Sequence, residues 1–405
     1  MTPPPGAPAS PQLLVGSVVL PDRLVADGAV VLVGDRILHA GRRDDPAVPV
    51  GAARADLPPD VLLLPGLVDL HCHGGAGGEF GSDRESARRA AEHHHLAGST
   101  TVVASLVSAR PAALVTAMRV CAELATEGVV AGVHTEGPFL SPARRGAHDP
   151  AALSPVDLGL VDSLADAGDG RWRAMTFAPE LDGTAELIRR LVDSGVVPAV
   201  GHTDADAATT TAALTRAAGL LGDRRRAVVT HLFNAMPAMH HREPGPVAAS
   251  LAAAARQEAV VELIADGVHL ADATVAMVLD VLGPGSVALV SDAMAATGMP
   301  EGRYRIGDLD AVVSAGTARL VDGDAIAGSV STLLDTVRRC VRHVGAPLPD
   351  AVRAASGTPA TVLGVDDEVG ALRPGLRADV VAVDRGLRPV AVWRAGHRLG
   401  PPHAP

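Results

Sequence analysis

The sequence predicts an α/β fold, a (β/α)8 TIM-like barrel with a small β-sandwich domain built from both chain termini. Two observations predict it. Apolar, β-branched runs alternate with Ala/Leu/Arg/Glu-rich segments through the middle of the 405 residues, and short β-like runs broken by turn residues occupy both ends. Eight parallel βα units over about 250 residues suit such a barrel. A doubly wound open sheet is the competing architecture, but no GxGxxG opens the first βα turn.

The two ends of the chain predict the smaller domain. Runs such as LLVGSVVL near the start and LRADVVAVD near the end are typical of antiparallel strands. We assign the small β-sandwich domain to residues 12–62 plus 358–405, and the catalytic barrel to residues 63–357. Residues 1–11, MTPPPGAPASP, have no basic n-region and no apolar h-region, so we expect a disordered tail rather than a signal peptide.

The middle of the chain contains eight apolar runs that we interpret as parallel barrel strands. They lie at residues 61–70, 99–107, 129–134, 174–179, 196–202, 227–232, 260–266 and 286–292. Segments of helical character lie between them, for example at residues 83–97, 110–127, 183–194 and 204–221. Strands that alternate with helices at this spacing indicate βα units.

Composition narrows the class of protein. Aromatic residues make up 2% of the chain, so the core must be built from Val, Leu, Ile and Ala. The formal net charge of −11 argues against binding to nucleic acid or to an anionic membrane surface. No run of about eighteen apolar residues lacks Gly, Pro or charge, so we expect no membrane span. The three cysteines are scattered and imply no disulfide framework, which favours a cytoplasmic protein.

Residues that can bind a metal follow the predicted strands at their carboxyl ends. They are His71, His73, Glu136, His202, His231, Asp266, His269 and Asp292. In a barrel enzyme the active site is built at that face, from the ends of several strands. Positions 71 and 73 point to the same side of an extended strand. Imidazoles together with carboxylates suit a divalent transition metal such as zinc or iron, with one or two ions bound.

Other candidate ligands have simpler explanations. His93, His94 and His95 lie in a predicted helix, where consecutive residues splay around the axis, so we expect a solvated or helix C-terminal role. Cys72 points away from the two strand-end histidines and is expected to be a buried packing residue. All 35 basic residues are arginine, so no lysine can act as a Schiff base, a general base or a carboxylated metal bridge.

Several short stretches resemble those of one enzyme superfamily. In chain order they are PGLVDLHCHGG, HTEGPF, RRGAHDP, GHTDAD, THLFNAM, REPG, ADGVH, VSDAMAATG and AGS, and they span residues 65–330. Together they resemble the amidohydrolase superfamily and, within it, the N-acetylglucosamine-6-phosphate deacetylases. A single His-X-His is generic, whereas HTEGP, THLFNAM and REPG in combination are far more specific. The resemblance implies metal-dependent hydrolysis of N-acetyl-D-glucosamine 6-phosphate to D-glucosamine 6-phosphate and acetate.

The resemblance also implies a cofactor, one or two divalent ions per subunit, with Zn2+ or Fe2+ expected. Many related binuclear enzymes bridge their two ions with a carboxylated lysine. This chain contains no lysine, so the bridge must be Glu136, as in the deacetylases. The metal ligands carried over are Glu136, His202 and His231 for one position and His71, His73 and Asp292 for the other. Asp292 and His148 are the implied catalytic residues. Asp292 would move a proton from water to the leaving nitrogen, and His148 would hold the carbonyl oxygen.

The implied substrate contacts come from several loops. They are Ala147, His148, Asn234, Ala235, Arg242, Asp266, His269, Ile326, Ala327 and Gly328. Arg242 is the expected phosphate ligand, because a guanidinium fork matches phosphate oxygens. In this family the phosphate arginine can reach across a dimer interface, so the resemblance implies a homodimer. Arg144 and Arg145 either assist an anionic substrate or are solvated charges on a mobile lid.

Two other functions are weighed against this one. The first alternative is another amidohydrolase, such as a deaminase or an N-acyl amino acid deacetylase, and both REPG and the glutamate bridge argue against it. The second is a non-catalytic protein on an inherited barrel. A decayed site would lack at least one metal ligand, and none is missing from the sequence.

Overall fold

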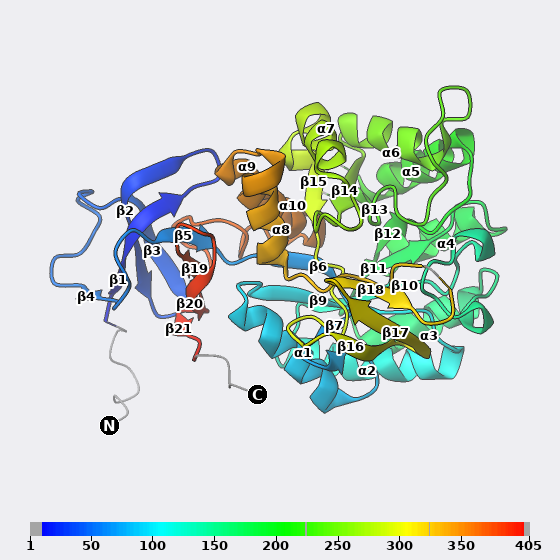
Figure 1. Cartoon of the computed structure of the whole chain (residues 1–405), viewed down its shortest axis with the longest axis horizontal. Coiled ribbons are helices and arrows are strands. Elements are labelled where there is room, and N and C mark those ends of the chain that lie inside the picture. Colours follow the sequence, from blue (N-terminus) through cyan, green and yellow to red (C-terminus); the bar gives the residue numbers. More distant parts are fainter. Residues whose placement is uncertain (1–9, 223–224, 324, 401–405) are drawn as a thin grey trace.

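The computed structural model describes residues 10–222, 225–323 and 325–400, which form two parts lying side by side (Figure 1). A small β domain contains strands from both chain ends, in blue and red, and a larger α/β barrel contains the middle of the chain. The predicted fold class is therefore confirmed. The tail predicted over residues 1–11 lies mostly outside the described residues. Among the described residues, no helix combines the length and apolar character needed to cross a membrane.

The small domain is one hydrogen-bonded sheet that joins the two ends of the chain. In spatial order its strands are β21 (His397–Arg398), β20 (Pro389–Arg394), β19 (Val380–Val383), β5 (Leu62–Pro65), β1 (Gln12–Val19), β2 (Leu24–Val33) and β3 (Arg36–Arg42), and β4 (Ala53–Arg54) pairs with β1. Strand β5 is parallel to β1 and antiparallel to β19, so it links the N-terminal strands to the C-terminal ones. The core of this sheet is mainly aliphatic and encloses the fully buried Trp393.

The barrel sheet has the strand order expected of eight successive βα units. Its strands are β6 (Val68–Cys72), β9 (Thr101–Leu106), β10 (Gly132–Glu136), β11 (Trp172–Phe177), β12 (Val197–Val200), β13 (Ala227–Val229), β14 (Ala259–Leu263) and β15 (Val287–Leu289). Each pairs in parallel with the next. An isolated parallel bridge between Cys72 of β6 and Ala293, which follows β15, brings the first and last strands together.

Helices alternate with these strands and lie outside them (Figure 1). They are α1 (Arg84–Leu96), α2 (Pro111–Thr126), α3 (Leu158–Gly168), α4 (Thr184–Asp193), α5 (Ala207–Leu221), α6 (Gly245–Ala255), α7 (Asp272–Leu282), α8 (Leu333–Arg339), α9 (Leu348–Ala354) and α10 (Gly357–Leu363). Short 3₁₀ turns η1 (Pro142–Arg144), η2 (Pro150–Ala152) and η3 (Pro284–Ser286), and the π turn η4 (Cys340–Val344), complete the helical segments.

Two small sheets lie above the strand ends and were not predicted. Strands β7 (Gly74–Gly75) and β8 (Gly78–Glu79) form a short ribbon, and β16 (Gly302–Ile306), β17 (Leu309–Ser314) and β18 (Thr317–Leu320) form an antiparallel sheet between β15 and α8. The antiparallel sheet has its own apolar core, which includes Ile306, Ala311 and Leu320. This insertion therefore adds a wall to the barrel mouth.

The prediction of a single strand over residues 61–70 is wrong. The run is divided between β5 of the small sheet and β6 of the barrel, with Gly66 and Leu67 between them. A Cβ on Gly66 would lie 2.0 Å from Oγ1 of Thr100, so the chain passes between the two sheets where only glycine fits. Both strands are largely buried, and an apolar run therefore gives no sign of the break.

The second predicted domain boundary, at residue 358, falls inside α10. This helix packs against β6 and β15 of the barrel. We therefore propose that the small domain resumes after Leu363 rather than at residue 358.

The three consecutive histidines lie in the last turn of α1, as predicted, but two of them are not solvated. His94 and His95 are 0% and 6% exposed. His94 donates from Nε2 to the carbonyl oxygen of Gly74 at 2.9 Å. Burial lowers the pKa of His94 to about 4, so this ring is neutral and anchors the ribbon at the barrel mouth.

Asp379, which precedes β19, ties the small domain to the barrel. Its Oδ2 accepts hydrogen bonds from Oγ1 of Thr100 at 2.8 Å and from Nε of Arg377 at 3.0 Å. Its Oδ1 accepts the backbone N–H of Ala395 at 2.8 Å. Arg377 in turn donates to Oγ1 of Thr101 at 2.9 Å. Because Asp379 is 4% exposed, these bonds compensate a buried charge at the junction of the two domains.

We expect Asp379→Ala to lower the free energy of unfolding by about 3–5 kcal/mol, because Arg377 would be left largely buried without its partner. Urea denaturation gives the change from the shift in midpoint. Asp22→Ala is the matched control, since Asp22 pairs with Arg23 at the exposed surface and should change stability by less than about 1 kcal/mol. Equal effects of the two substitutions would contradict a stabilising junction.

Candidate metal centre and active site

Six side chains converge at the carboxyl ends of the barrel strands. They are His71 and His73 from the end of β6, Glu136 from the end of β10, and His202, His231 and Asp292 from the turns after β12, β13 and β15. All six are less than 10% exposed. His202, His231 and Asp292 have φ angles of 48°, 28° and 47°, a left-handed backbone that costs a non-glycine residue about 1–3 kcal/mol. The turns are therefore strained where they aim these side chains inward.

Glu136 lies at the centre of this cluster. Its Oε1 is 2.9 Å from Nε2 of His202 and 2.9 Å from Nε2 of His231. Its Oε2 is 3.2 Å from Nε2 of His73 and 3.2 Å from Nε2 of His148. The two oxygens thus face different imidazoles, and the carboxylate is placed to bridge two positions.

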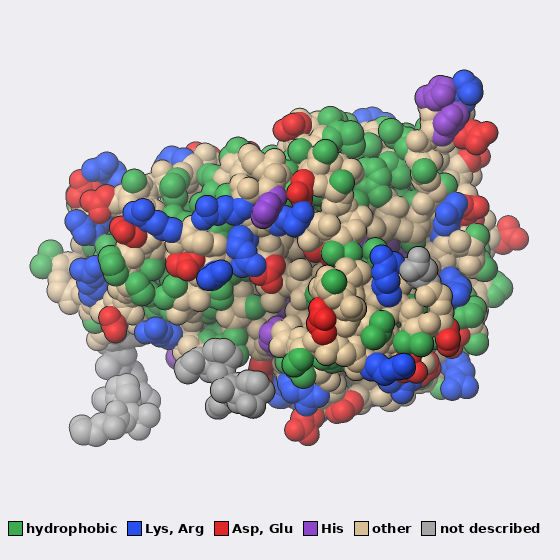
Figure 2. Space-filling view, viewed as in Figure 1, with side chains coloured by type: hydrophobic (Ala, Val, Ile, Leu, Met, Phe, Trp, Pro, Cys, Tyr) green, Lys and Arg blue, Asp and Glu red, His purple; other side chains and the backbone are tan. Residues whose placement is uncertain are grey.

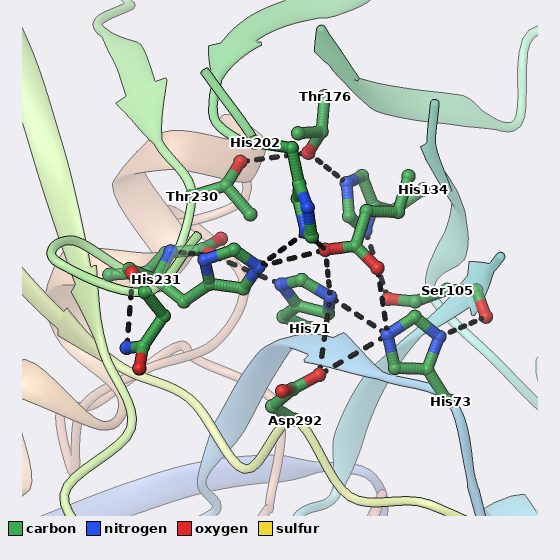
Figure 3. A network of polar contacts seen from close by, with 12 residues as sticks. His71, His73, Ser105, His134, Thr176, His202, Thr230, His231 and Asp292 are labelled. Carbon is green, nitrogen blue, oxygen red and sulfur yellow. Dashed lines mark hydrogen bonds and ion pairs between the residues drawn. The ribbon is translucent and has the colours of Figure 1, made fainter. Parts of the chain in front are cut away.

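The second position is formed by His71, His73 and Asp292, which face one another in Figure 3. The Nε2 atoms of the two histidines are 3.0 Å apart. Oδ1 of Asp292 is 3.5 Å from Nε2 of His71 and 3.2 Å from Nε2 of His73. One carboxylate oxygen and two imidazole nitrogens therefore point at a common centre.

Hydrogen bonds at Nδ1 decide which nitrogen three of the histidines offer. The acceptors are the Glu262 carboxylate for His71 at 3.1 Å, the Ser105 carbonyl for His73 at 3.1 Å and the Arg144 carbonyl for His202 at 2.8 Å. A carbonyl or carboxylate oxygen can only accept, so each Nδ1 carries the hydrogen. Each Nε2 is left to bind a proton or a metal ion, which is the tautomer that a metal site requires.

These Nε2 atoms lie too close together to be satisfied by one another. The distance is 3.0 Å between His71 and His73 and 3.1 Å between His202 and His231. When both rings of a pair are neutral, lone pairs face each other and repel, and a proton or a metal ion between them removes the repulsion. Nitrogen ligands at 2.0–2.1 Å from a tetrahedral zinc lie about 3.3–3.4 Å apart. The donor set of this chain therefore fits a divalent metal at either position.

His148 has the opposite tautomer. Its Nδ1 accepts the backbone N–H of Ser108 at 3.3 Å, so its Nε2 carries the hydrogen and donates to Oε2 of Glu136. Burial lowers the pKa of His148 to about 4, which keeps the ring neutral. His148 is thus a hydrogen-bond donor at the site, although its distance to Glu136 and His202 alone would also suit a ligand.

The charges of the cluster perturb its pKa values strongly. Burial alone would lower the pKa of His71, but Glu136 and Asp292 outweigh it and raise the pKa well above its usual range. Burial is likewise outweighed at His73, where Asp292 and Glu136 raise the pKa to about 9. The neighbouring histidines hold the pKa of both carboxyls well below their usual range despite burial. Both carboxylates are therefore ionised at neutral pH.

A supporting layer behind these residues was not found from the sequence. Oε2 of Glu262 accepts from the His71 ring and, at 3.2 Å, from the backbone N–H of His231. His134 bonds Oγ of Ser105 at 3.0 Å and Oγ1 of Thr176 at 2.8 Å, beside His71 (Figure 3). One sign was present in the sequence: Glu262 is the single charged residue in the apolar strand β14, AVVEL.

The cluster forms the floor of a cavity of about 370 Å³. Of the predicted residues, those lining it are His73, Glu136, Ala147, His148, His202, His231, Asn234, Ala235, His269, Asp292, Ile326 and Gly328. The cavity is also lined by residues that the sequence did not suggest, namely Val107, Gly146, Ile264, Ile306, Arg319 and Ala325. Arg319 and Ile306 come from the inserted sheet, which therefore contributes a cation and an apolar contact to the site.

The other predicted substrate residues lie outside this lining. Asp266 accepts the Nδ1 hydrogen of His269 at 2.8 Å and so orients a ring that does line the cavity. Ala327 is fully buried and does not line the cavity, unlike its neighbours Ile326 and Gly328. Arg242 is exposed on the loop between β13 and α6, where its guanidinium lies 2.9 Å from His241. Arg242 is not among the described residues that line the cavity of its own chain.

The side chains of Arg144 and Arg145 contact other residues of the protein. Arg144 forms an exposed ion pair with Asp204 at 2.7 Å. Arg145 donates to the carbonyl oxygen of His148 at 2.9 Å. These contacts restrain the loop that carries His148, and the carbonyl oxygen of Arg144 accepts the Nδ1 hydrogen of His202.

Comparison with known proteins identifies the family of the chain. A family model described as the amidohydrolase family matches residues 62–399. The chain is 40% identical to a solved variant of the N-acetyl-D-glucosamine-6-phosphate deacetylase of Mycobacterium smegmatis in complex with N-acetyl-D-glucosamine 6-phosphate, with a TM-score of 0.89 and coverage of 96% of this chain and 99% of that one. A curated relative from Escherichia coli O157:H7, an N-acetylgalactosamine-6-phosphate deacetylase, is 34% identical over 86% of this chain and 90% of its own. The N-acetylglucosamine-6-phosphate deacetylase of Bacillus subtilis strain 168 is also 34% identical, over 80% of this chain and 81% of its own. The chain belongs to the amidohydrolase family.

Proposed function

We propose that this protein hydrolyses N-acetyl-D-glucosamine 6-phosphate to D-glucosamine 6-phosphate and acetate. The observation that carries the proposal is the set of inward-facing Nε2 atoms around Glu136, at the floor of a cavity that also contains Asp292 and His148. The names of the relatives supply the substrate class. A deaminase or an N-acyl amino acid deacetylase is the less favoured alternative, because those substrates lack the phosphate that Arg242 would bind.

The direct test is acetate release by the purified, metal-supplemented protein. N-acetylglucosamine 6-phosphate is compared with N-acetylgalactosamine 6-phosphate, since one relative carries that name, and with an N-acetyl amino acid. We expect turnover of the hexosamine phosphates alone. Hydrolysis of only the amino acid derivative would overturn the proposed substrate.

We propose that Glu136, His202 and His231 hold one divalent ion and that His71, His73 and Asp292 can hold a second, with Zn2+ or Fe2+ expected from the nitrogen-rich donor set. When bound, such an ion lowers the pKa of a water molecule toward about 7 and polarises the acetyl carbonyl. Glu262 raises the basicity of His71 by accepting its Nδ1 hydrogen, and it restrains the backbone of His231.

Asp292 is placed to transfer the proton. Its carboxylate is ionised at neutral pH, lines the cavity and points its Oδ1 at the histidine pair. It can therefore accept the proton of the attacking water and later deliver it to the nitrogen of the departing amine. His148 lines the same cavity, and its Nε2–H, which donates to Glu136 in this structure, would serve an oxyanion on the acetyl oxygen once Glu136 binds the metal.

The phosphate end of the substrate requires cations. Asn234 and Ala235 line the cavity in the turn after β13, and Arg319 approaches it from the inserted sheet. Because Arg242 is exposed on a projecting loop of its own chain, we propose that it binds the phosphate held in a partner subunit, and hence that the protein is a homodimer. A cytoplasmic location is predicted from cysteine usage and is proposed on that ground alone.

We expect Glu136→Gln to deplete bound metal, because the substitution removes the carboxylate that faces both sets of imidazoles. His95→Ala is the control, since His95 is buried at the end of α1 and should retain the metal content of the wild type. Elemental analysis of the purified proteins measures the metal content of the two variants. An unchanged metal content in Glu136→Gln would contradict the bridging role of Glu136.

We expect Asp292→Asn to lower kcat by about 10²–10⁴-fold, because the amide cannot accept a proton from water. Most of the metal should remain, since the histidine ligands are unchanged. Asp280→Asn, on the exposed surface of α7, is the control. If acetate release by Asp292→Asn stays above about a tenth of the wild-type rate, the proton-transfer role is wrong.

We expect Arg242→Met to raise KM for N-acetylglucosamine 6-phosphate about ten- to a hundredfold, the loss of one charge-assisted contact. Activity on unphosphorylated N-acetylglucosamine should be unchanged.

Mixed dimers test which subunit supplies the arginine. If Arg242 acts across the interface, combining Arg242→Met and Asp292→Asn chains recreates one intact site per mixed dimer and restores about a quarter of wild-type activity after random pairing. No recovery would place Arg242 in its own site.

A further inference from the structure

A second cavity lies between the small domain and the base of the barrel. It has a volume of about 410 Å³ and is formed by the turn after β1, by the segment 369–373 and by helices α9 and α10. Its barrel side is made by Arg226 and Gly285, which lie just before β13 and β15. These are the amino ends of the strands, so the cavity lies at the opposite end of the barrel from the metal cluster.

Three guanidinium groups line this cavity, from Arg226, Arg353 and Arg373. Arg226 donates to the side-chain oxygen of Gln257 at 3.1 Å, and Arg373 donates to the backbone oxygen of Asp366 at 3.3 Å. Within the described part of the chain, no carboxylate forms an ion pair with any of the three. The Asp366 carboxylate, which is exposed, also lines the cavity, so the four charged groups sum to 3 − 1 = +2.

Arg226 and Arg353 line the same cavity, and among the described residues neither is paired with an acid. Burial and, after it, the positive charge of Arg353 lower the pKa of Arg226. Guanidinium groups of like charge repel one another. The chain as a whole has more acidic than basic residues, with a net charge of −11, so a general excess of arginine does not account for this pair. An anion between them would convert this repulsion into attraction.

The remaining walls are apolar. They are formed by side chains such as Val19, Leu20, Pro65, Val352, Val369 and Leu372. A ligand that fits this cavity therefore combines a doubly charged anionic head with a carbon skeleton. A phosphate monoester has this charge near neutral pH, and the planar fork of arginine matches its oxygens.

We propose that this interdomain cavity is a binding site for a small organic phosphate, with Arg226 and Arg353 as the anion ligands. The site is distinct from the deacetylase centre, because none of its residues lines the cavity above the metal cluster. Its ligand would contact both domains at once and would therefore stabilise their association.

The test is isothermal titration of the full-length, metal-loaded protein with phenyl phosphate, which carries a phosphate and an apolar ring and has no amide to hydrolyse. We expect the Arg226→Gln/Arg353→Gln double variant to bind it at least about tenfold more weakly than the wild type. Arg119→Gln, on the exposed surface of α2, is the matched control and should bind like the wild type. All three proteins should retain the same kcat/KM for N-acetylglucosamine 6-phosphate.

Further ligands define the chemistry of the site. Inorganic phosphate should bind more weakly than phenyl phosphate, and phenol and benzoate more weakly still. An equal Kd for inorganic phosphate or for benzoate would overturn the proposed ligand class. Equal binding of phenyl phosphate by the wild type and the double variant, or no binding up to about 10 mM, would overturn the site itself. Because turnover is not needed for these titrations, their result is independent of the proposed deacetylation.

Discussion

The catalytic end of the barrel depends on the contacts between the buried carboxylate of Glu136 and the imidazoles around it. A carboxylate that is 3% exposed is unfavourable unless charges or hydrogen-bond donors surround it. Here Nε2 atoms from four strand ends or loops lie within 3.2 Å of its two oxygens. The barrel thus brings together groups that require a shared positive charge, and a divalent metal would supply that charge without changing the tautomers that the Nδ1 partners of His73 and His202 fix.

The tautomers separate the roles of histidines that distance alone would group together. His202 and His148 both lie near Glu136, but Nδ1 of His202 donates to a carbonyl whereas Nδ1 of His148 accepts from an amide. One ring therefore presents an acceptor to the cavity and the other a donor. Metal binding needs the first and stabilisation of an oxyanion needs the second. The supporting hydrogen bonds, more than the positions of the rings, specify the chemistry.

Three residues of the metal cluster are both buried and left-handed in their backbone conformation. The left-handed backbone of His202, His231 and Asp292 is unfavourable for each residue and persists because the surrounding strands and Glu262 restrain the turns. The small sheet, which contains strands from both ends of the chain, is held to the barrel through Asp379.

The sequence alone determined the alternation of strands and helices, the metal-ligand candidates at the strand ends and the family resemblance, because each depends on local pattern or on the identity of residues within short motifs. It also excluded a lysine bridge by composition. It did not reveal the break between β5 and β6, the inserted sheet that brings Arg319 to the cavity, or the roles of Glu262 and His134. Each of these depends on contacts between residues distant in the chain. His94 illustrates the same limit: its position in a helix was predictable, but its burial against Gly74 depends on a ribbon formed by another segment. The tertiary structure alone decided which ring nitrogen faces inward at His71, His73, His148 and His202, because the partner of Nδ1 in each of them comes from a distant strand or loop.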